Sequence, residues 1–122
     1  MFNRLFTIFC VSHFTKIMTT LHLNLKKKWF DMILSGEKTE EYRDITEYWK
    51  KRLTKHWEHP TYERKSYDTI TFSNGYSKNR RQFVIKYHQL RVGKGKHKWG
   101  ADYGIDYFKL YLGKIISTTN CG

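Results

Sequence analysis

A glycine and three charged residues with the spacing of a binding site lie close together in the first half of the chain. Gly36 fits the left-handed conformation that ends a helix, and Lys38, Glu41 and Arg43 follow it. Alternate side chains of a strand share a face, so Glu41 and Arg43 point to one side, and Lys38 can lean toward them. An amine, a carboxylate and a guanidinium on one partly covered face form a polar site. The alternative is a solvated strand whose charges pair with one another.

Each of these charged residues has a role that its chemistry permits. Arg43 can bind a phosphate through two parallel hydrogen bonds, or it can pair with Glu41. Glu41 can accept hydrogen bonds from the exocyclic amine of a base. Lys38 can contact phosphate, or act catalytically if desolvation lowers its pKa. Lys38 and Glu41 are therefore the candidate catalytic residues if the protein is an enzyme, which the spacing does not require.

The motif Gly-x-Lys-x-x-Glu-x-Arg, from Gly36 to Arg43, resembles the signature of the ASCH domain. That domain is a small β-barrel related to the PUA domain of RNA-modifying proteins. The resemblance spans roughly residues 20–115 and implies an α+β fold. The expected architecture is a small PUA-like β-barrel of about five to six strands with two short helices near the N-terminal half. The signature would line a cleft between barrel and helices. Four further stretches share the resemblance, at residues 21–25, 29–35, 67–77 and 93–100.

Known activities of ASCH-like proteins imply two alternatives for this chain. Some are amidohydrolases that remove the acetyl group from N4-acetylcytidine, and a nuclease activity is also associated with the group. The amidohydrolase motif resembles Gly-x-Lys-Thr-x-Thr-x-Arg, so Lys38 and Thr39 match it, whereas Glu41 replaces its second threonine. The amidohydrolases also use a later glutamate, and this chain has none between Arg64 and Gly122. These departures favour a nucleic-acid-binding module over a hydrolase of modified nucleosides or RNA; a protein-interaction module is a third class.

The net charge also favours a polyanionic partner. The 122 residues include 23 Lys and Arg against 11 Asp and Glu, which gives a formal net charge of +12. Nucleic acid is the first candidate partner for such a basic chain, and a membrane surface is the second. We expect RNA or single-stranded nucleic acid, or a modified nucleoside, as the partner, with no membrane involved, and we assume a monomer. Aromatic residues make up 17% of the chain, so the modest core is expected to be largely aromatic.

The cysteines and the termini complete the predicted organisation. Cys10 and Cys121 have no metal-ligand neighbours at a suitable spacing, so we expect no metal site, no cofactor and a reducing, cytoplasmic setting. We interpret residues 1–17 as a disordered or wrongly assigned N-terminal extension. Residues 18–116 form the ASCH/PUA-like domain, and residues 117–122 are expected to be a loose C-terminal tail.

Hydrophobic periodicity predicts the elements that position these residues. We expect two helices, over residues 27–35 and 46–54. Thr46 or Asp44 can cap the second of them. Residues 56–65 show no clear period and are predicted to be a loop. Besides the signature strand, the predicted strands cover residues 21–25, 67–72, 82–92 and 106–116.

Clusters of cations and aromatic residues supply further candidate contacts. One cluster opens the first helix, a second lies at the tip of an Asn-Gly hairpin after residue 72, and a third occupies the flexible, glycine-rich loop 93–100. In such clusters bases stack on rings while cations hold phosphates; the alternative is solvated surface. Trp99 is either a stacking surface or a plug of the core. The candidate nucleic-acid-binding residues are Lys27, Lys28, Lys38, Glu41, Arg43, Tyr76, Lys78, Arg80, Arg81, Lys94, Lys96 and Trp99.

Overall fold

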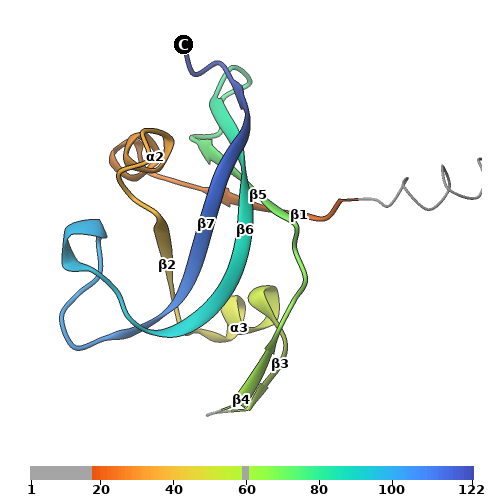
Figure 1. The fold of residues 1–122 in the computed structure, drawn as a ribbon, viewed down its shortest axis with the longest axis vertical. Helices are drawn as coiled ribbons and strands as arrows, with labels where there is room; N and C mark the ends of the chain where they lie inside the picture. Colours follow the sequence, from red (N-terminus) through yellow and green to blue (C-terminus); the bar gives the residue numbers. More distant parts are fainter. Residues whose placement is uncertain (1–17, 59–60) are drawn as a thin grey trace, which may run out of the picture.

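A curled, half-barrel sheet of five strands organises the structure, a computed structural model that describes residues 18–58 and 61–122 (Figure 1). Two helices and a separate two-stranded sheet accompany it, which makes a small mixed α/β domain. The predicted N-terminal extension, residues 1–17, lies outside the described residues. In chain order the elements are β1 (Thr20–Asn24), α2 (Lys27–Leu34), β2 (Glu40–Asp44), α3 (Glu47–Leu53), β3 (Thr54–Glu58), β4 (Thr61–Arg64), β5 (Thr69–Asn74), β6 (Arg81–Lys94), the 3-10 helix η1 (His97–Trp99) and β7 (Asp106–Thr119).

The sheet has the strand order β1–β5–β6–β7–β2. β1 runs parallel to β5, and the other neighbouring strands are antiparallel. The long strands β6 and β7 curve together through the middle of the sheet (Figure 1). The two edge strands are therefore close to each other, since Nη2 of Arg43 on β2 donates to the backbone oxygen of Asn24 on β1 at 3.2 Å. This approach of the two edges places the signature strand beside β1.

A core of aliphatic and aromatic side chains packs between α2 and the sheet. Leucine and isoleucine outnumber the aromatic residues among its buried members, so the expectation of a largely aromatic core is wrong. Phe30 and Ile33 of α2 are buried, which confirms the apolar stripe expected for this helix. The ring of Phe30 lies 4.8 Å from that of Phe83, and the rings of Phe72 and Phe83 are 5.5 Å apart. α2 is thereby fixed against the sheet, and so is the turn that leads into β2.

Both predicted helices are confirmed, but the predicted loop over residues 56–65 is wrong. Thr46 caps α3, because its Oγ1 accepts a hydrogen bond from the backbone N–H of Trp49 at 3.3 Å. Residues 54–58 and 61–64 form the antiparallel pair β3–β4. Trp57 and Tyr62 face each other across it, with ring centroids 5.5 Å apart and nearly stacked. Such a cross-strand pair stabilises a hairpin that alternation along one strand does not reveal.

The predicted C-terminal boundary at residue 116 is also wrong. β7 continues to Thr119, because Ser117 and Thr118 pair with the opposing residues of β6. Beyond the strand, Sγ of Cys121 donates to the backbone oxygen of Gln82 at 3.2 Å. The first half of the predicted loose tail, residues 117–119, is therefore part of the sheet.

Irregular pairing between β6 and β7 changes which β6 side chains face the core. Strict alternation places Phe83, Ile85 and Tyr87 on one face and Leu90 on the other. All four are buried in the same core, because the pairing register shifts between Tyr87 and Gln89. An extra residue of this kind moves the side chains that follow to the opposite face.

The region predicted as a flexible loop at residues 93–100 is packed against the domain. β6 extends to Lys94, and η1 and Gly100 then return the chain toward β7. Trp99 is 5% exposed and belongs to a small cluster with Tyr42, Ala101 and Tyr107. Of the two roles open to Trp99, the structure therefore assigns the core plug, and its candidacy as a stacking surface is wrong.

Gly95→Ala should destabilise the protein by about 1–3 kcal/mol, the usual cost of overpacking. A Cβ at this position would lie 2.7 Å from Cβ of Ala101 and 2.8 Å from the Tyr42 ring. Gly93→Ala, two residues earlier near the end of β6, is the matched control, since the nearest neighbour of a Cβ there is a Lys109 side-chain carbon at 3.8 Å. Urea unfolding measures both variants, and equal stabilities would contradict the packing described here.

Tyr87 gives the stability a defined dependence on alkaline pH. Burial raises the pKa of this phenol from 10.0 to about 12. The folded protein then holds the proton more tightly than the unfolded chain, so stability falls as pH rises from 10 through about 12. One pKa unit corresponds to about 1.4 kcal/mol, so the shift of about two units makes the full loss roughly 3 kcal/mol. Urea unfolding across this range should show a shallower decline for Tyr87→Phe than for the unaltered protein; parallel declines would refute this.

Candidate nucleic-acid interface

The three charged residues of the signature form one connected chain of ion pairs. Nζ of Lys38 donates to Oε1 of Glu41 at 2.6 Å, and Nη1 of Arg43 donates to Oε2 of the same carboxylate at 2.9 Å. The backbone N–H of Tyr42 also donates to Oε1 at 3.0 Å. The predicted grouping of these side chains on one face of the strand is confirmed.

Local structure explains why these charges meet. Gly36 has a φ of 87°, which ends α2 and turns the chain, and the backbone N–H of Lys38 bonds the Met32 oxygen at 2.9 Å. β2 then pairs with β7, with Glu41 opposite Leu110. The ammonium of Lys38 lies 4.8 Å from the Trp29 ring centroid, so an aromatic face covers it.

Lys38 and Glu41 are buried, with side chains only 1% and 5% exposed. Burial lowers the pKa of Lys38 from its ordinary 10.5, although the Glu41 carboxylate opposes that shift. The unfolded chain therefore binds this proton more tightly than the folded protein, and the contribution of Lys38 to stability rises as pH increases toward 10.5. Both residues were predicted to contact a ligand or to act as catalysts, but this placement makes them internal supports of Arg43.

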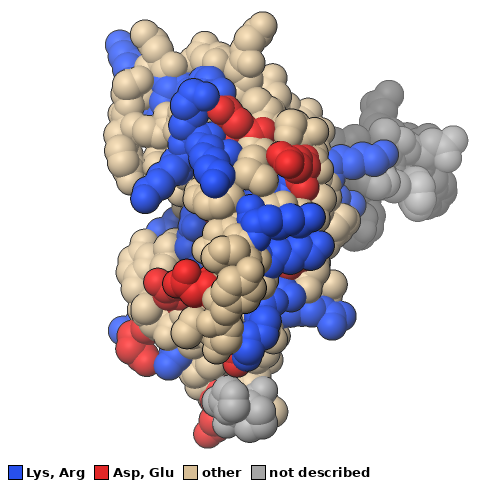
Figure 2. All heavy atoms as spheres, turned by 90° about the vertical axis from the view of Figure 1, so that its left-hand side faces the viewer, with Lys and Arg blue, Asp and Glu red and all other residues tan. Residues whose placement is uncertain are grey.

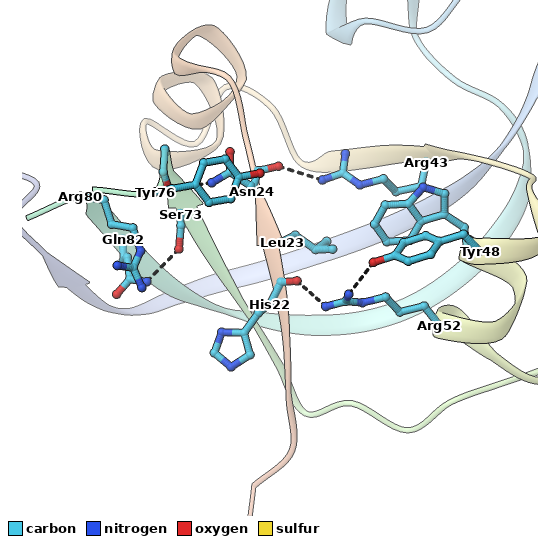
Figure 3. Close-up of a pocket in the computed structure, with 12 residues that line it drawn as sticks. His22, Leu23, Asn24, Arg43, Tyr48, Arg52, Ser73, Tyr76, Arg80 and Gln82 are labelled. Atoms are coloured by element: carbon cyan, nitrogen blue, oxygen red, sulfur yellow. Dashed lines mark hydrogen bonds between the residues drawn. The ribbon is translucent and has the colours of Figure 1, made fainter. Parts of the chain in front are cut away.

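Of these three charged residues, Arg43 reaches a pocket with a volume of about 750 Å³ (Figure 3). Lys38 instead contributes to a smaller cavity of about 390 Å³ between α2 and β7. The cleft expected beside the signature is thus present, but the signature enters it through one side chain. The larger pocket is lined by His22, Leu23, Asn24, Arg43, Tyr48, Trp49, Arg52, Ser73, Gly75, Tyr76, Arg80 and Gln82.

One side of the pocket combines two arginines with two aromatic rings. The guanidinium carbons of Arg43 and Arg52 lie 5.2 and 5.9 Å from the Trp49 ring centroid. Nη1 of Arg52 donates to the hydroxyl of Tyr48 at 2.8 Å, and its Nη2 donates to the backbone oxygen of His22 at 2.7 Å. We call these residues, Arg43, Tyr48, Trp49 and Arg52, the α3 group. Both guanidiniums are oriented by bonds to the protein, which suits them to bind an anion.

The opposite side of the pocket comes from the β5–β6 hairpin. Gly75 has a φ of 87°, which fits the predicted Asn-Gly turn. Tyr76 follows it and is 89% exposed. Nη1 of Arg80 donates to the backbone oxygen of Ser77 at 3.2 Å. With the amide of Gln82 turned, its oxygen accepts from Nε and Nη2 of Arg80, each at 3.1 Å. We call Tyr76, Arg80 and Gln82 the hairpin group.

The pocket is electrostatically positive. Among the described residues that line it, three are arginines and none is acidic. Cations are also plentiful elsewhere, since Figure 2 shows Lys and Arg side chains across one face of the molecule, with acidic residues in smaller groups between them. A concave surface of one charge sign concentrates oppositely charged ligands.

Of the other predicted site residues, Tyr76 and Arg80 line the same pocket as Arg43. The rest lie outside its lining. Arg81 is held within the fold, because it pairs with Asp31 at 2.8 Å and lies 4.6 Å from the Phe30 ring. Lys27 also pairs with Asp31, and Lys94 pairs with Asp106. The other predicted site residues outside the lining are Lys28, Lys38, Glu41, Lys78, Lys96 and Trp99.

Sequence reasoning missed much of the pocket. His22 and Asn24 occupy the polar positions of the alternating strand β1, and a strand's polar face was not considered as a site. Tyr48 and Arg52 of α3 were not among the predicted site residues, although Tyr48 is 58% exposed. The available signal was the mixture of aromatic and cationic residues within α3. In the described ranges, no group of three or more His, Cys, Asp or Glu residues is placed to hold a metal ion.

Comparisons with protein-family models, curated proteins and solved structures find no match. The function of this protein is therefore inferred from the geometry of the pocket. Within the described parts of the chain, no helix is long and apolar enough to cross a membrane.

Proposed function

We propose that this protein is a nucleic-acid-binding module that holds a base-bearing, phosphorylated segment of RNA or of another single strand in the 750 Å³ pocket. The observation that carries the proposal is the combination of three arginines with exposed Tyr48 and Tyr76 in one concavity that has no acidic lining residue among those described. Arginines bind phosphates bidentately, and unpaired bases stack on aromatic rings. The net charge of +12 supports the same partner.

The proposal includes an ASCH-like, PUA-like identity for the domain and a cytoplasmic location. Two observations support the family assignment: the signature residues form one ion-pair chain, and the sheet curls into a half-barrel. In this interpretation the role of the signature is to hold Arg43 at the mouth of the pocket, with Glu41 as its support.

A hydrolase acting on a modified nucleoside or on RNA is the alternative, and the geometry favours it less. Lys38 and Glu41 were its candidate catalytic residues, and both are buried away from the pocket. A general acid or base has to come within hydrogen-bond distance of the substrate. Incubation with N4-acetylcytidine, followed by chromatography, tests this alternative: turnover that Lys38→Ala abolishes would establish it and displace the binding module.

Binding should be strongest for single strands and should weaken steeply with salt. Three arginines that each neutralise one phosphate predict a slope of about −2 for log K against log salt, because each contact on a single strand contributes about −0.7. Fluorescence anisotropy with labelled single-stranded and duplex RNA and DNA measures both quantities. Absence of binding at low salt, or affinity independent of salt, would exclude the proposed function.

A further inference from the structure

The cations and rings of the pocket are divided between its two sides. Figure 3 shows Arg43, Tyr48 and Arg52 on one side, Tyr76 and Arg80 on the other, with the β1 segment that carries His22, Leu23 and Asn24 between them. The α3 group and the hairpin group come from segments far apart in the sequence. Each group nevertheless has the same composition, since each combines an exposed tyrosine with at least one arginine.

The arginines of the α3 group retain hydrogen-bonding capacity for a ligand. A guanidinium has five N–H donors. Arg43 directs Nη1 at Glu41 and at the Tyr42 oxygen, and Nη2 at the Asn24 oxygen. Arg52 makes one hydrogen bond to Tyr48 and one to His22. These bonds fix the planes of both groups and leave donors for a phosphate, beside a tyrosine ring on which a base can stack.

The hairpin group offers a second, separate position of the same chemistry. The ring of Tyr76 is almost entirely exposed at the turn. Arg80 is oriented by the Ser77 oxygen and, with the Gln82 amide turned, by the Gln82 side-chain oxygen, which in that orientation also accepts from Ser73 Oγ at 2.8 Å. Asn24 ties β1 to this turn, because its Nδ2 donates to the Gly75 oxygen at 2.8 Å. The spacing between the two groups is thereby set by β1.

We propose that the pocket is a two-nucleotide site: two linked nucleotides of one strand cross β1, one at the α3 group and the other at the hairpin group. This inference rests on the proposed function. A mononucleotide has one base and one phosphate group, so it can satisfy only one of the two groups. The volume of about 750 Å³ lies in the upper part of the range of about 300–1,000 Å³ for ligand sites. A duplex fits poorly, since its bases are already paired and stacked.

The test compares a nucleoside 5′-monophosphate, the corresponding 5′-phosphorylated dinucleotide and a single strand of about 8 nucleotides, by titration at one low salt concentration. We expect the dinucleotide to bind at least about tenfold more tightly than the monophosphate, which corresponds to about 1.4 kcal/mol. Arg52→Ala and Arg80→Ala should each weaken binding of the dinucleotide about tenfold. Only one of the two substitutions should weaken binding of the monophosphate. Arg91→Ala, an exposed arginine outside the pocket lining, is the control.

The outcomes separate this inference from the proposed function. If none of the three ligands binds, the proposed function fails, and this inference fails with it. If the longer strand binds but the monophosphate matches the dinucleotide, only the two-nucleotide site is refuted. The same conclusion follows if Arg80→Ala and Tyr76→Ala both leave the dinucleotide affinity unchanged. Both residues lie in the turn between β5 and β6, where Tyr76 is exposed and Arg80 is half-buried, and circular dichroism checks that the variants remain folded.

Discussion

Glu41→Ala should lower the free energy of unfolding by about 3–5 kcal/mol, the usual cost of removing one partner of a buried ion pair. The carboxylate lies between Lys38 at 2.6 Å and Arg43 at 2.9 Å. Without it, the buried lysine has to remain charged with no counter-charge or lose its proton, and both alternatives cost free energy. The loss should be smaller at alkaline pH, where Lys38 gives up its proton more readily. Urea unfolding at neutral and alkaline pH measures both effects.

A surface pair with the same sequence spacing supplies the matched control. Glu47 and Lys50 are also three residues apart and lie at 2.9 Å, but the Glu47 side chain is 80% exposed. Glu47→Ala should therefore cost much less than Glu41→Ala, because an exposed ion pair contributes little to stability. The double replacement of Lys38 by Met and Glu41 by Leu removes both buried charges, so it should be more stable than Glu41→Ala alone. If Glu41→Ala costs no more than Glu47→Ala, the buried ion pairs of Glu41 do not stabilise the fold.

Arg52→Ala should weaken binding of a single strand about tenfold and reduce the magnitude of the salt slope by about 0.7, the contribution of one phosphate contact. The same substitution also releases Tyr48, whose hydroxyl accepts a hydrogen bond from Arg52 at 2.8 Å, so the stacking surface is less well positioned. Arg52→Lys keeps the charge but loses the planar fork, and its affinity should lie between those of the alanine variant and the unaltered protein.

Arg91→Ala controls for the loss of one positive charge at another position. Arg91 is exposed on β6, nine residues beyond Gln82, which corresponds to about 30 Å along the strand. Its replacement should leave affinity within about twofold at physiological salt, because separated surface charges are largely screened there. Anisotropy titrations at several salt concentrations compare the two alanine variants. Equal losses for Arg52→Ala and Arg91→Ala would indicate diffuse attraction by the net charge, and the pocket would not be the site.

The sequence predicted the elements better than their ends. The strand over residues 21–25, the helix over residues 27–35 and the cap at Thr46 each depend on residues close in the sequence, and all three are confirmed. The β3–β4 hairpin and the last residues of β7 were missed, because pairing with another strand stabilises them. Strict alternation also assigned the β6 residues after Tyr87 to the wrong face. The reason is related, because a register shift depends on two paired strands and cannot be read from one of them.

By itself, the sequence determined the net charge and the face shared by Glu41 and Arg43, since alternation along a strand fixes which side chains are neighbours. Only the tertiary structure decided that Lys38 and Glu41 are buried and that Arg43 reaches the pocket. Burial depends on what covers a face, here α2 and the edges of a curled sheet. The pocket joins β1, α3 and the β5–β6 hairpin, and contacts between such distant segments arise when the chain folds.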